Sequence, residues 1–160
     1  MSEPNYPVTQ GVRFLRANKV EFVPLLYDYV DRGGTAVAAQ QLKIEEHAIV
    51  KTIVFEDERK RPVIVLMHGD REVSAKTLAR LRGTKSYLPC DPSVVTKHTG
   101  YVVGGTSPFG TKARLPVVMQ ESVLDINTVY INGGKRGFLV GVNPLQIKQI
   151  LSAEILNVAA

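Results

Sequence analysis

The sequence has no tryptophan and a single cysteine, Cys90. One cysteine excludes an internal disulfide, and this usage is typical of proteins from the reducing cytoplasm. The longest apolar stretches, such as 63–67, span only a few residues. A transmembrane helix needs about 20, so no membrane segment is expected. Residues 1–7 include Glu3 and two prolines and lack an apolar core, so no secretory signal is expected either. We therefore predict a cytoplasmic protein.

The composition is that of a folded chain with a modest positive charge. Of the 160 residues, 44% are hydrophobic and 22% are charged, which permits a packed core and excludes disorder as the main state. This length fits one domain, predicted over residues 1–160. The net charge of +5 is compatible with a polyanionic partner but does not require one.

Apolar patterning and turn signals predict a fold that contains both helices and strands. The expected N-caps are Thr35, Ser74, Asp91 and Asn143, and Pro7 fits a first helical turn. Strands outnumber helices and several are joined by short turns, which favours a mixed, largely antiparallel α/β or α+β fold. Helices are expected at 8–19, 35–42, 74–83, 92–100 and from 144 onward; strands are expected at 22–29, 50–56, 62–68, 101–103, 116–119, 128–131, 138–142 and 155–158.

The sequence gives little support for a metal site or for a serine nucleophile. The three histidines, His47, His68 and His98, lie 21 and 30 residues apart, and no second cysteine exists, so neither a metal nor another cofactor is expected. Ser107 follows two glycines, but a nucleophile elbow needs glycine two residues after the serine, where Phe109 stands.

Two glycine clusters are candidate ligand loops. Residues 104–110, GGTSPFG, could aim main-chain N–H groups at a developing oxyanion, or could form a tight turn between strands. Residues 133–137, GGKRG, could form a hairpin turn, or could present amides and cations to a phosphate. The pattern leaves both alternatives open.

Lys51 begins a strand that is apolar on both faces. Such a lysine either reaches the rim of the sheet or lines a cleft, where it would offer a positive charge to a phosphate or carboxylate. Tyr27 and Tyr29 share one strand face and could either line a cleft or cover the edge of the core. Cys90 is expected to be a small buried apolar residue.

Four segments of the sequence occur together in a fixed order. They are Tyr27 after a short strand, VKTIV at 50–54, TGYVVGGTSPFG at 99–110 followed by RLP at 114–116, and YINGGKRG at 130–137. This set closely resembles the YbaK/EbsC family of aminoacyl-tRNA editing proteins. The resemblance covers about residues 8–157. The family's best-known members are Cys-tRNA(Pro) deacylases, and it includes the editing domain inserted in many bacterial prolyl-tRNA synthetases.

This resemblance implies a barrel-like mixed sheet with flanking helices and hydrolysis of a mischarged ester on tRNA(Pro), most often of cysteine. Lys51 matches the lysine that holds the terminal adenosine, and Gly104 and Gly105 match the loop that frames the reacting carbonyl. The substrate's own thiol would attack that carbonyl, so the protein needs no nucleophile. The remaining matched positions, taken as substrate-binding, are Tyr27, Thr52, Thr106, Ser107, Pro108, Asn132, Gly133 and Gly134.

The expected partners are the 3′ end of an aminoacylated tRNA and, transiently, prolyl-tRNA synthetase. Two positions depart from the family pattern: Leu139 stands where an acidic residue is common, and Asn132 where a serine is common. These departures leave open hydrolysis of Ala-tRNA(Pro) or another aminoacyl-tRNA. A module that binds aminoacyl-tRNA or a nucleotide without hydrolysis is the alternative of another class.

Overall fold

The computed structural model describes residues 5–160. Residues 1–4, part of the segment on which the expectation of no secretory signal depends, lie outside the described residues. No helix within residues 5–160 combines the length and the apolar character needed to cross a membrane. The helices are α1 (Gln10–Ala17), α2 (Gly34–Leu42), α3 (Ala75–Arg82), α4 (Pro92–Thr99) and α5 (Pro144–Leu151), with 3-10 turns η1 (Glu46–Ala48) and η2 (Glu121–Asp125).

Eight strands form one mixed sheet in the order β1-β7-β6-β2-β3-β5-β8, with β4 added to β2. Antiparallel pairing joins β1 to β7, β7 to β6, β2 to β3 and β2 to β4, whereas β2–β6, β3–β5 and β5–β8 are parallel. The predicted mixed, largely antiparallel class is therefore confirmed. The strands are β1 (Val23–Leu26), β2 (Ile49–Asp57), β3 (Pro62–His68), β4 (Tyr87–Pro89), β5 (Val117–Gln120), β6 (Val129–Asn132), β7 (Phe138–Val142) and β8 (Glu154–Leu156).

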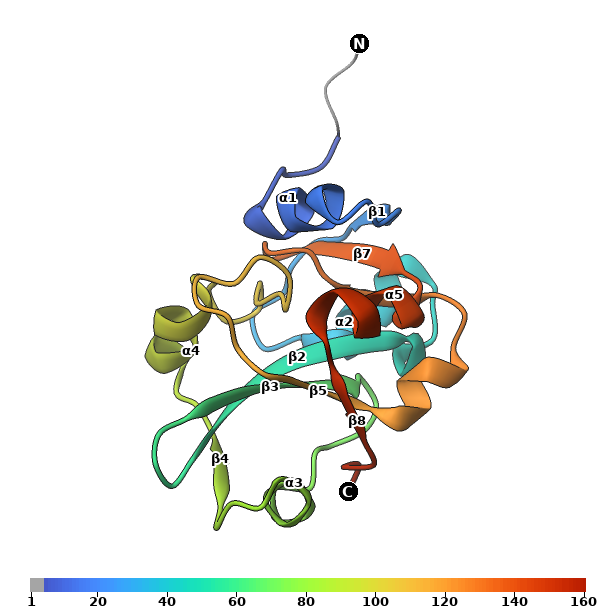
Figure 1. Ribbon diagram of the computed structural model, residues 1–160. Coiled ribbons are helices and arrows are strands. Elements are labelled where there is room, and N and C mark those ends of the chain that lie inside the picture. The colour runs from blue at the N-terminus through green and yellow to red at the C-terminus, as the bar shows by residue number, and fades with distance from the viewer. Residues whose placement is uncertain (1–4) are drawn as a thin grey trace.

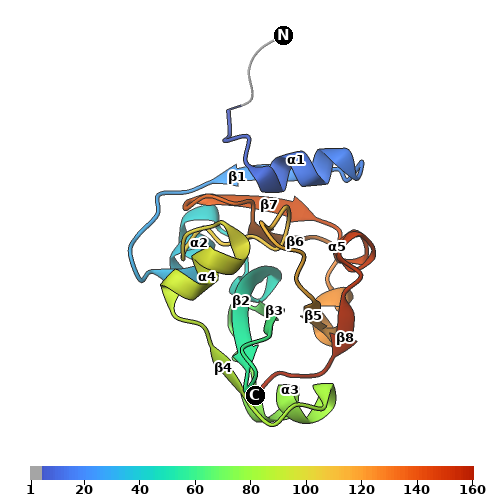
Figure 2. The same cartoon turned by 60° about the vertical axis from the view of Figure 1, so that its left-hand side comes forward.

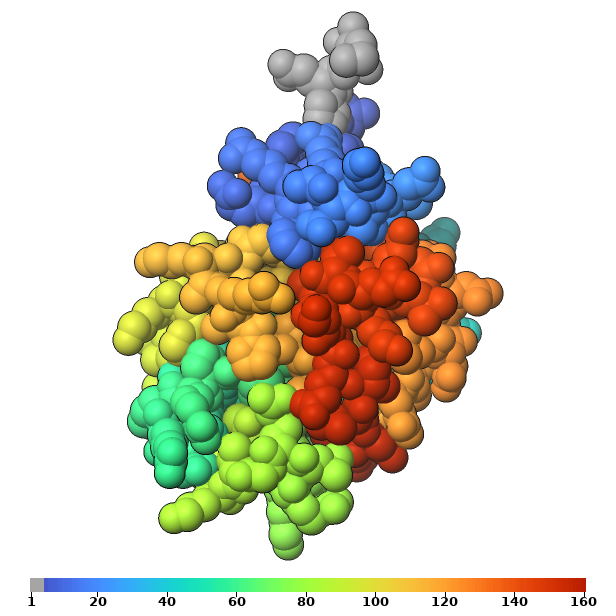
Figure 3. All heavy atoms as spheres, viewed as in Figure 1, coloured from blue at the N-terminus to red at the C-terminus, as the bar shows by residue number. Residues whose placement is uncertain are grey.

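The sheet curls, and helices cover its surfaces (Figures 1 and 2). The largest core cluster lies under α1 and α5 and includes Leu15, Phe109, Phe138 and Ile147, all fully buried. A second cluster packs α3 on β2 and β3 through Leu78. A third and smaller cluster packs α2 on β2 and β7. The N-terminal and C-terminal thirds of the chain meet on one face of the molecule (Figure 3).

Most of the predicted caps are present. Ser74 Oγ accepts a hydrogen bond from Thr77 N, Asn143 Oδ1 accepts one from Leu145 N, and Gly83 and Gly100 end their helices with φ of 73° and 81°. Asp91 is the N-cap of α4 by position, but its side chain makes no cap bond.

Several predicted boundaries are wrong for identifiable reasons. Helix α1 starts after Thr9, whose Oγ1 accepts from Val12 N, so Pro7 lies outside it. The strand predicted at 22–29 ends at Leu26, because the Gln41 side chain bonds both main-chain groups of Asp28.

The strand predicted at 101–103 is a loop, and the short strand β4 was missed. The Tyr101 side chain folds back onto the loop that follows, where its hydroxyl donates to the carbonyl of Phe109. Thr35 is not the cap of α2, since Gly33 holds that position and Thr35 Oγ1 donates instead to Glu46 Oε2 at 2.6 Å.

Candidate active site

A cavity of about 450 Å³, here called the central pocket, opens beside β2. Its walls come from residues 27–38, which include the start of α2, from residues 49–54 of β2, and from the segment between β4 and α4. The 103–106 loop and the β6–β7 turn complete it. Helices α2 and α4 lie beside β2 in Figure 2, and both contribute to the lining.

Six of the residues predicted for the site line this pocket: Tyr27, Lys51, Thr52, Gly104, Thr106 and Asn132. They come from four separate stretches of the chain. The sequence left open which of Tyr27 and Tyr29 faces the cavity, and the structure shows that both line it. Burial, together with the neighbouring Tyr29, raises the pKa of the Tyr27 hydroxyl, so Tyr27 is neutral at physiological pH.

Within residues 5–160, one edge of strand β2 lacks a partner strand at the pocket, while the other edge is paired with β3. Ile49 O accepts from Gly69 N and Asp57 N donates to Arg61 O, so the odd-numbered residues of β2 direct their main-chain groups toward the β3 side. Even-numbered residues direct theirs to the opposite edge, where Val54 O accepts from Cys90 N at 2.9 Å.

On that opposite edge β6 pairs only with Ile49 and Val50, and β4 pairs only with residues 55–57. The N–H and C=O of Thr52 therefore face the gap between these two strands. Thr52 Oγ1 is also buried, and it has no hydrogen-bond partner among residues 5–160. Buried polar groups are rarely left unpaired in proteins, so the unpaired Thr52 Oγ1, beside two main-chain groups that face the pocket, points to a ligand.

Lys51 occupies the first part of the same strand. Its side chain is 22% exposed, and Nζ lies 3.1 Å from Oε1 of Glu72, a residue whose own side chain is 80% exposed. The lysine therefore reaches the rim and also lines the pocket, which were the two alternatives drawn from its sequence pattern. An exposed carboxylate holds it only weakly and can be displaced by a ligand anion.

The GGTSPFG loop contributes its first half to the pocket. Gly104 adopts φ of 91°, and a Cβ there would lie 2.7 Å from the Tyr29 hydroxyl. The N–H of Gly104 has no partner among the described residues, whereas the N–H of Gly105 donates to Val102 O at 2.9 Å. Gly105, Ser107 and Pro108 are buried beneath the lining.

Main-chain amides of the GGKRG turn donate hydrogen bonds to other groups of the protein. Gly133 N donates to Phe138 O, and the N–H groups of Gly134 and Lys135 donate to Asn132 Oδ1 at 2.6 and 3.1 Å. Gly133 O accepts from the hydroxyl of Thr9. Gly133 and Gly134 lie outside the lining, and their occupied amides do not support the alternative in which this turn binds a phosphate through its main chain.

The two glycine clusters are packed against each other. A Cβ on Gly105 would lie 2.8 Å from Arg136 N, and Asn132 Nδ2 donates to Gly104 O at 3.1 Å. Arg136 Nε donates to Val103 O at 3.0 Å. These contacts fix the position of Gly104 at the mouth of the pocket.

Sequence reasoning assigned no site role to many of the pocket residues, including Arg32, Thr35, Cys90 and Leu139. Thr35 was treated only as a cap and Cys90 only as a core residue, whereas Arg136 belonged to the turn whose cations were one alternative for a phosphate contact. Leu139 was noted as a departure from the family pattern, and it lies directly opposite Asn132 in the β6–β7 register. For Arg136 the sequence did offer a signal, because a positive charge within a glycine-rich turn can indicate a ligand contact.

Among the described residues that line the pocket, no hydroxyl or thiol is paired with a histidine that could activate it as a nucleophile. No histidine lines it. Burial, with the nearby carboxylates of Glu56 and Asp91, raises the pKa of the Cys90 thiol to about 11, so the reactive thiolate is scarce. Ser107 Oγ is fully buried and accepts a hydrogen bond from Phe109 N.

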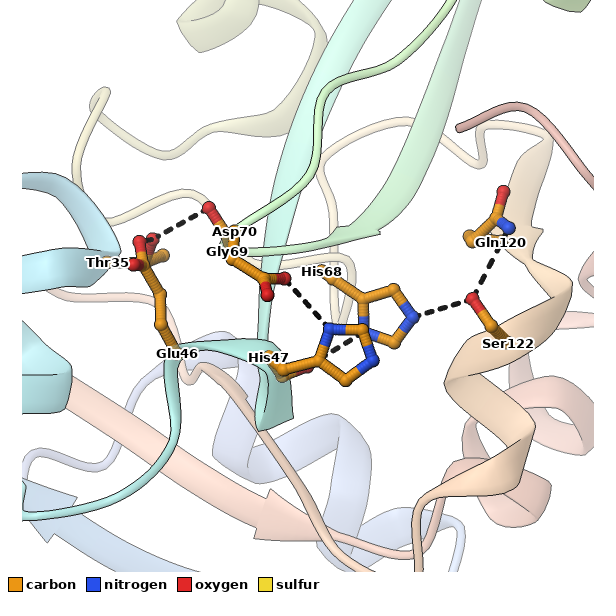
Figure 4. A network of polar contacts seen from close by, with 8 residues as sticks. All are labelled: Thr35, Glu46, His47, His68, Gly69, Asp70, Gln120 and Ser122. Carbon is orange, nitrogen blue, oxygen red and sulfur yellow. Dashed lines mark hydrogen bonds and ion pairs between the residues drawn. The ribbon is translucent and has the colours of Figure 1, made fainter. Parts of the chain in front are cut away.

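A serine–histidine pair does exist elsewhere, at the far ends of β3 and β5 (Figure 4). His68 Nε2 lies 2.7 Å from Ser122 Oγ, and Nδ1 lies 2.7 Å from His47 O. His68 is 1% exposed and stacks on His47 with ring centroids 3.8 Å apart. None of these three residues lines the central pocket, so we interpret the pair as part of a buried polar network. No group of three or more potential metal ligands occurs within residues 5–160.

Comparisons with known proteins identify the family of the chain. Residues 33–150 match the family described as the aminoacyl-tRNA editing domain. A relative from Enterococcus faecalis, named as a candidate Cys-tRNA(Pro)/Cys-tRNA(Cys) deacylase, EbsC, is 26% identical over 94% of this chain and 92% of its own. A proline–tRNA ligase of Desulfotalea psychrophila is 33% identical over 61% of this chain and 16% of its own.

The fold has a solved counterpart with almost complete overlap. The crystal structure of a candidate trans-editing enzyme for prolyl-tRNA synthetase superposes with a TM-score of 0.83 at 24% identity, covering 98% of this chain and 99% of that one. At this identity the superposition shows the shared fold alone, while the family match covers most of the chain. The chain therefore belongs to the aminoacyl-tRNA editing domain family, of the YbaK/EbsC type.

Proposed function

We propose that this protein is a trans-editing deacylase that hydrolyses the ester of cysteinyl-tRNA(Pro). The observation that carries the proposal is the central pocket itself. It combines unpaired polar groups on Thr52, a free amide on Gly104 and the cation of Lys51, and it has no histidine and no reactive thiol in its lining. Such a site can position and polarise an ester, but it has no nucleophile of its own.

In this mechanism the reacting sulfur belongs to the substrate. The cysteinyl thiol loses its proton and attacks the ester carbonyl carbon, forming a C–S bond. The bond from that carbon to the ribose oxygen breaks, and the ribose oxygen takes up a proton. Water then opens the resulting four-membered thiolactone to free cysteine. The protein supplies orientation and hydrogen bonds to the carbonyl oxygen as it becomes negative.

Each pocket group has a role in this reaction. The main-chain N–H groups of Thr52 and Gly104 donate to the developing oxyanion, and Lys51 leaves Glu72 to contact the anionic end of the tRNA. Loss of one oxyanion donor costs about 10²–10³ in rate where it has been measured. The buried residues Gly105, Pro108 and Gly133, with the half-buried Gly134, act by holding Gly104 and Asn132 in place.

The pocket's far side suits a small uncharged side chain. Leu139 packs with Ala38 and Ile49, and all three line the cavity. An acidic residue at position 139 would add a buried charge there, whereas leucine keeps this wall apolar. This chemistry favours cysteine or alanine over a charged amino acid.

The test is loss of the ester from Cys-tRNA(Pro), Ala-tRNA(Pro) and Pro-tRNA(Pro) with purified protein. We expect rapid loss of the cysteinyl ester and an inert prolyl ester. Prolyl-tRNA synthetase is added in a parallel arm, since a chain of this size has little surface for reading the tRNA body, and we expect the synthetase to increase selectivity for tRNA(Pro). Tight tRNA binding with no hydrolysis in either arm would instead establish a binding module.

A further inference from the structure

Three cations line the central pocket, and they differ in what holds them. Lys51 is paired with Glu72, as described above. Arg32 and Arg136 have no carboxylate partner among residues 5–160. Arg136 alone is fixed by neutral contacts: Nε donates to Val103 O at 3.0 Å, and Cζ lies 4.9 Å from the centroid of the Tyr29 ring.

This arrangement leaves the two terminal nitrogens of the Arg136 guanidinium free to donate hydrogen bonds. The Nε contact and the Tyr29 ring fix the plane of the group, while no hydrogen bond within the described residues engages the two terminal nitrogens of Arg136. A planar guanidinium with its fork free matches two oxygens of a phosphate, and an already ordered side chain loses less entropy on binding. The ligand class that fits is therefore a phosphodiester.

The position of Arg136 fits a ligand that enters the pocket end first. Its anchor, Val103, is 43% exposed, and the neighbouring Val102 is 53% exposed, so apolar surface lies beside the cation. A cation next to exposed apolar side chains suits a nucleotide, which presents a phosphate and an apolar base face together. A free amino acid would need only the interior of the pocket.

We propose that Arg136 binds the phosphodiester at the acceptor end of the tRNA when the aminoacyl group occupies the central pocket. The inference rests on the proposed function, which identifies the nucleic acid as tRNA. It assigns the phosphate contact to the Arg136 side chain, and not to the main chain of the GGKRG turn. Lys51, which must first leave Glu72, then provides a second cation for the anionic end of the tRNA.

The experiment compares Arg136→Ala and Arg136→Lys with Lys135→Ala. Lys135 is the adjacent residue, carries the same charge and does not line the pocket, so its removal controls for net charge. Binding of a short single-stranded RNA ending in CCA is measured between 50 and 300 mM salt, which requires no hydrolysis. One lost phosphate contact on a single strand lowers the log–log salt slope by about 0.7.

We expect Arg136→Ala to lower the slope by about that amount and Lys135→Ala to leave it near the wild-type value. Arg136→Lys keeps the slope and loses part of the affinity, since an ammonium cannot bind two oxygens in parallel. With Cys-tRNA(Pro), Arg136→Ala should raise KM about tenfold or more and lower kcat by a smaller factor, because the contact to Val103 O also helps to place Gly104.

Two results would overturn the inference: equal salt slopes in Arg136→Ala and wild type, or equal changes in both alanine variants. A fall in kcat alone would mean that Arg136 only positions the Val103–Gly104 loop, which also contradicts it. These outcomes are separate from the proposed function. If wild type hydrolyses no ester, the deacylase proposal fails, while the RNA-binding measurement still decides the role of Arg136.

Discussion

At the scale of single residues, the site is marked by polar groups that the folded chain leaves unpaired. Thr52 is the clearest case, with a buried hydroxyl and two main-chain groups facing a gap in the sheet. A buried unpaired group lowers the stability of the free protein, and we expect a bound ligand to supply the missing hydrogen bond.

Replacing Thr52 with valine should therefore move stability and activity in opposite directions. The change removes an unpaired buried hydroxyl at nearly constant shape, so we expect the free energy of unfolding to rise by up to about 1–2 kcal/mol. We expect kcat/KM for Cys-tRNA(Pro) to fall. Denaturant unfolding and steady-state kinetics measure the two effects, and Thr52→Ser is the matched control that keeps the hydroxyl. A destabilised Thr52→Val protein would show that Oγ1 already has a partner in solution.

Lys51 and Glu72 provide a second pair of variants. Lys51→Ala should lower kcat/KM roughly 10- to 100-fold, the loss expected for a hydrogen bond to a charged group. Glu72→Ala frees the lysine and removes a side chain that is 80% exposed, so activity should stay the same or rise. Circular dichroism checks that both variants are folded. A large loss in Glu72→Ala would mean that the ion pair itself, and not the free lysine, supports the reaction.

The residue types at the site could be predicted, but their partners could not. Sequence similarity picked out Lys51, Thr52 and Gly104, which line one cavity. The contact between Lys51 and Glu72 joins residues 21 positions apart, and that between Arg136 and Val103 joins residues 33 apart. Such contacts depend on strand register and loop packing, which no local pattern encodes.

At the scale of elements, the pocket exists because β2 is longer than the strands on one of its edges. Its nine residues pair with β3 along almost their full length, while β6 and β4 take only the two ends of the other edge. The unpaired middle is then open to α2, α4 and the two glycine loops. The sequence predicted β2, β3 and their hairpin because both strands are rich in β-branched residues. It missed β4, whose three residues include a proline and give no periodic signal.

The contact between the two glycine loops is testable at Gly105. A Cβ there would lie 2.8 Å from Arg136 N and 3.0 Å from Lys135 C, and both are main-chain atoms that cannot turn away. We expect Gly105→Ala to destabilise the protein by about 1–3 kcal/mol and to lower activity by separating Gly104 from Asn132. Thermal unfolding and the deacylation assay provide the measurements. Wild-type stability in this variant would show that the loops are not packed together in solution.

At the scale of the whole molecule, a buried polar network joins segments that the sheet alone does not hold together. His68 at the end of β3 bonds His47 of η1 and Ser122 of η2, and Gln120 Oε1 accepts from Val158 N and Ala159 N near the C-terminus. The first part of this network can be followed in Figure 4. The sequence predicted the mixed fold class correctly from strand and turn signals, but a network of residues 21 to 54 positions apart had no such signal.

This network should make stability depend on pH. Burial lowers the pKa of His68 below its ordinary value near 6.5, since the charged imidazolium is disfavoured there. Below about pH 6.5 the unfolded chain then binds a proton that the folded protein does not, so the free energy of unfolding falls as the pH drops from about 6.5 toward the lowered folded pKa.

Nuclear magnetic resonance titration of the His68 ring measures that pKa directly, and urea unfolding at pH 7.0 and 5.5 measures the stability difference. The His68→Gln variant should lose this part of the pH dependence. An ordinary or raised pKa for His68 would contradict the buried network, whether or not the variant folds.

In the proposed reaction, the pocket orients an ester whose own sulfur performs the attack. The most direct measurement compares kcat/KM for cysteinyl- and seryl-tRNA(Pro), which differ by one atom and bind with nearly the same shape. A serine hydroxyl is a far weaker nucleophile than a thiol, and the pocket has no histidine to activate it. We predict hydrolysis of the cysteinyl ester at least about a hundredfold faster than that of the seryl ester, a barrier difference of about 2.7 kcal/mol. Equal rates would show that water or a protein group attacks the carbonyl, and would contradict the account.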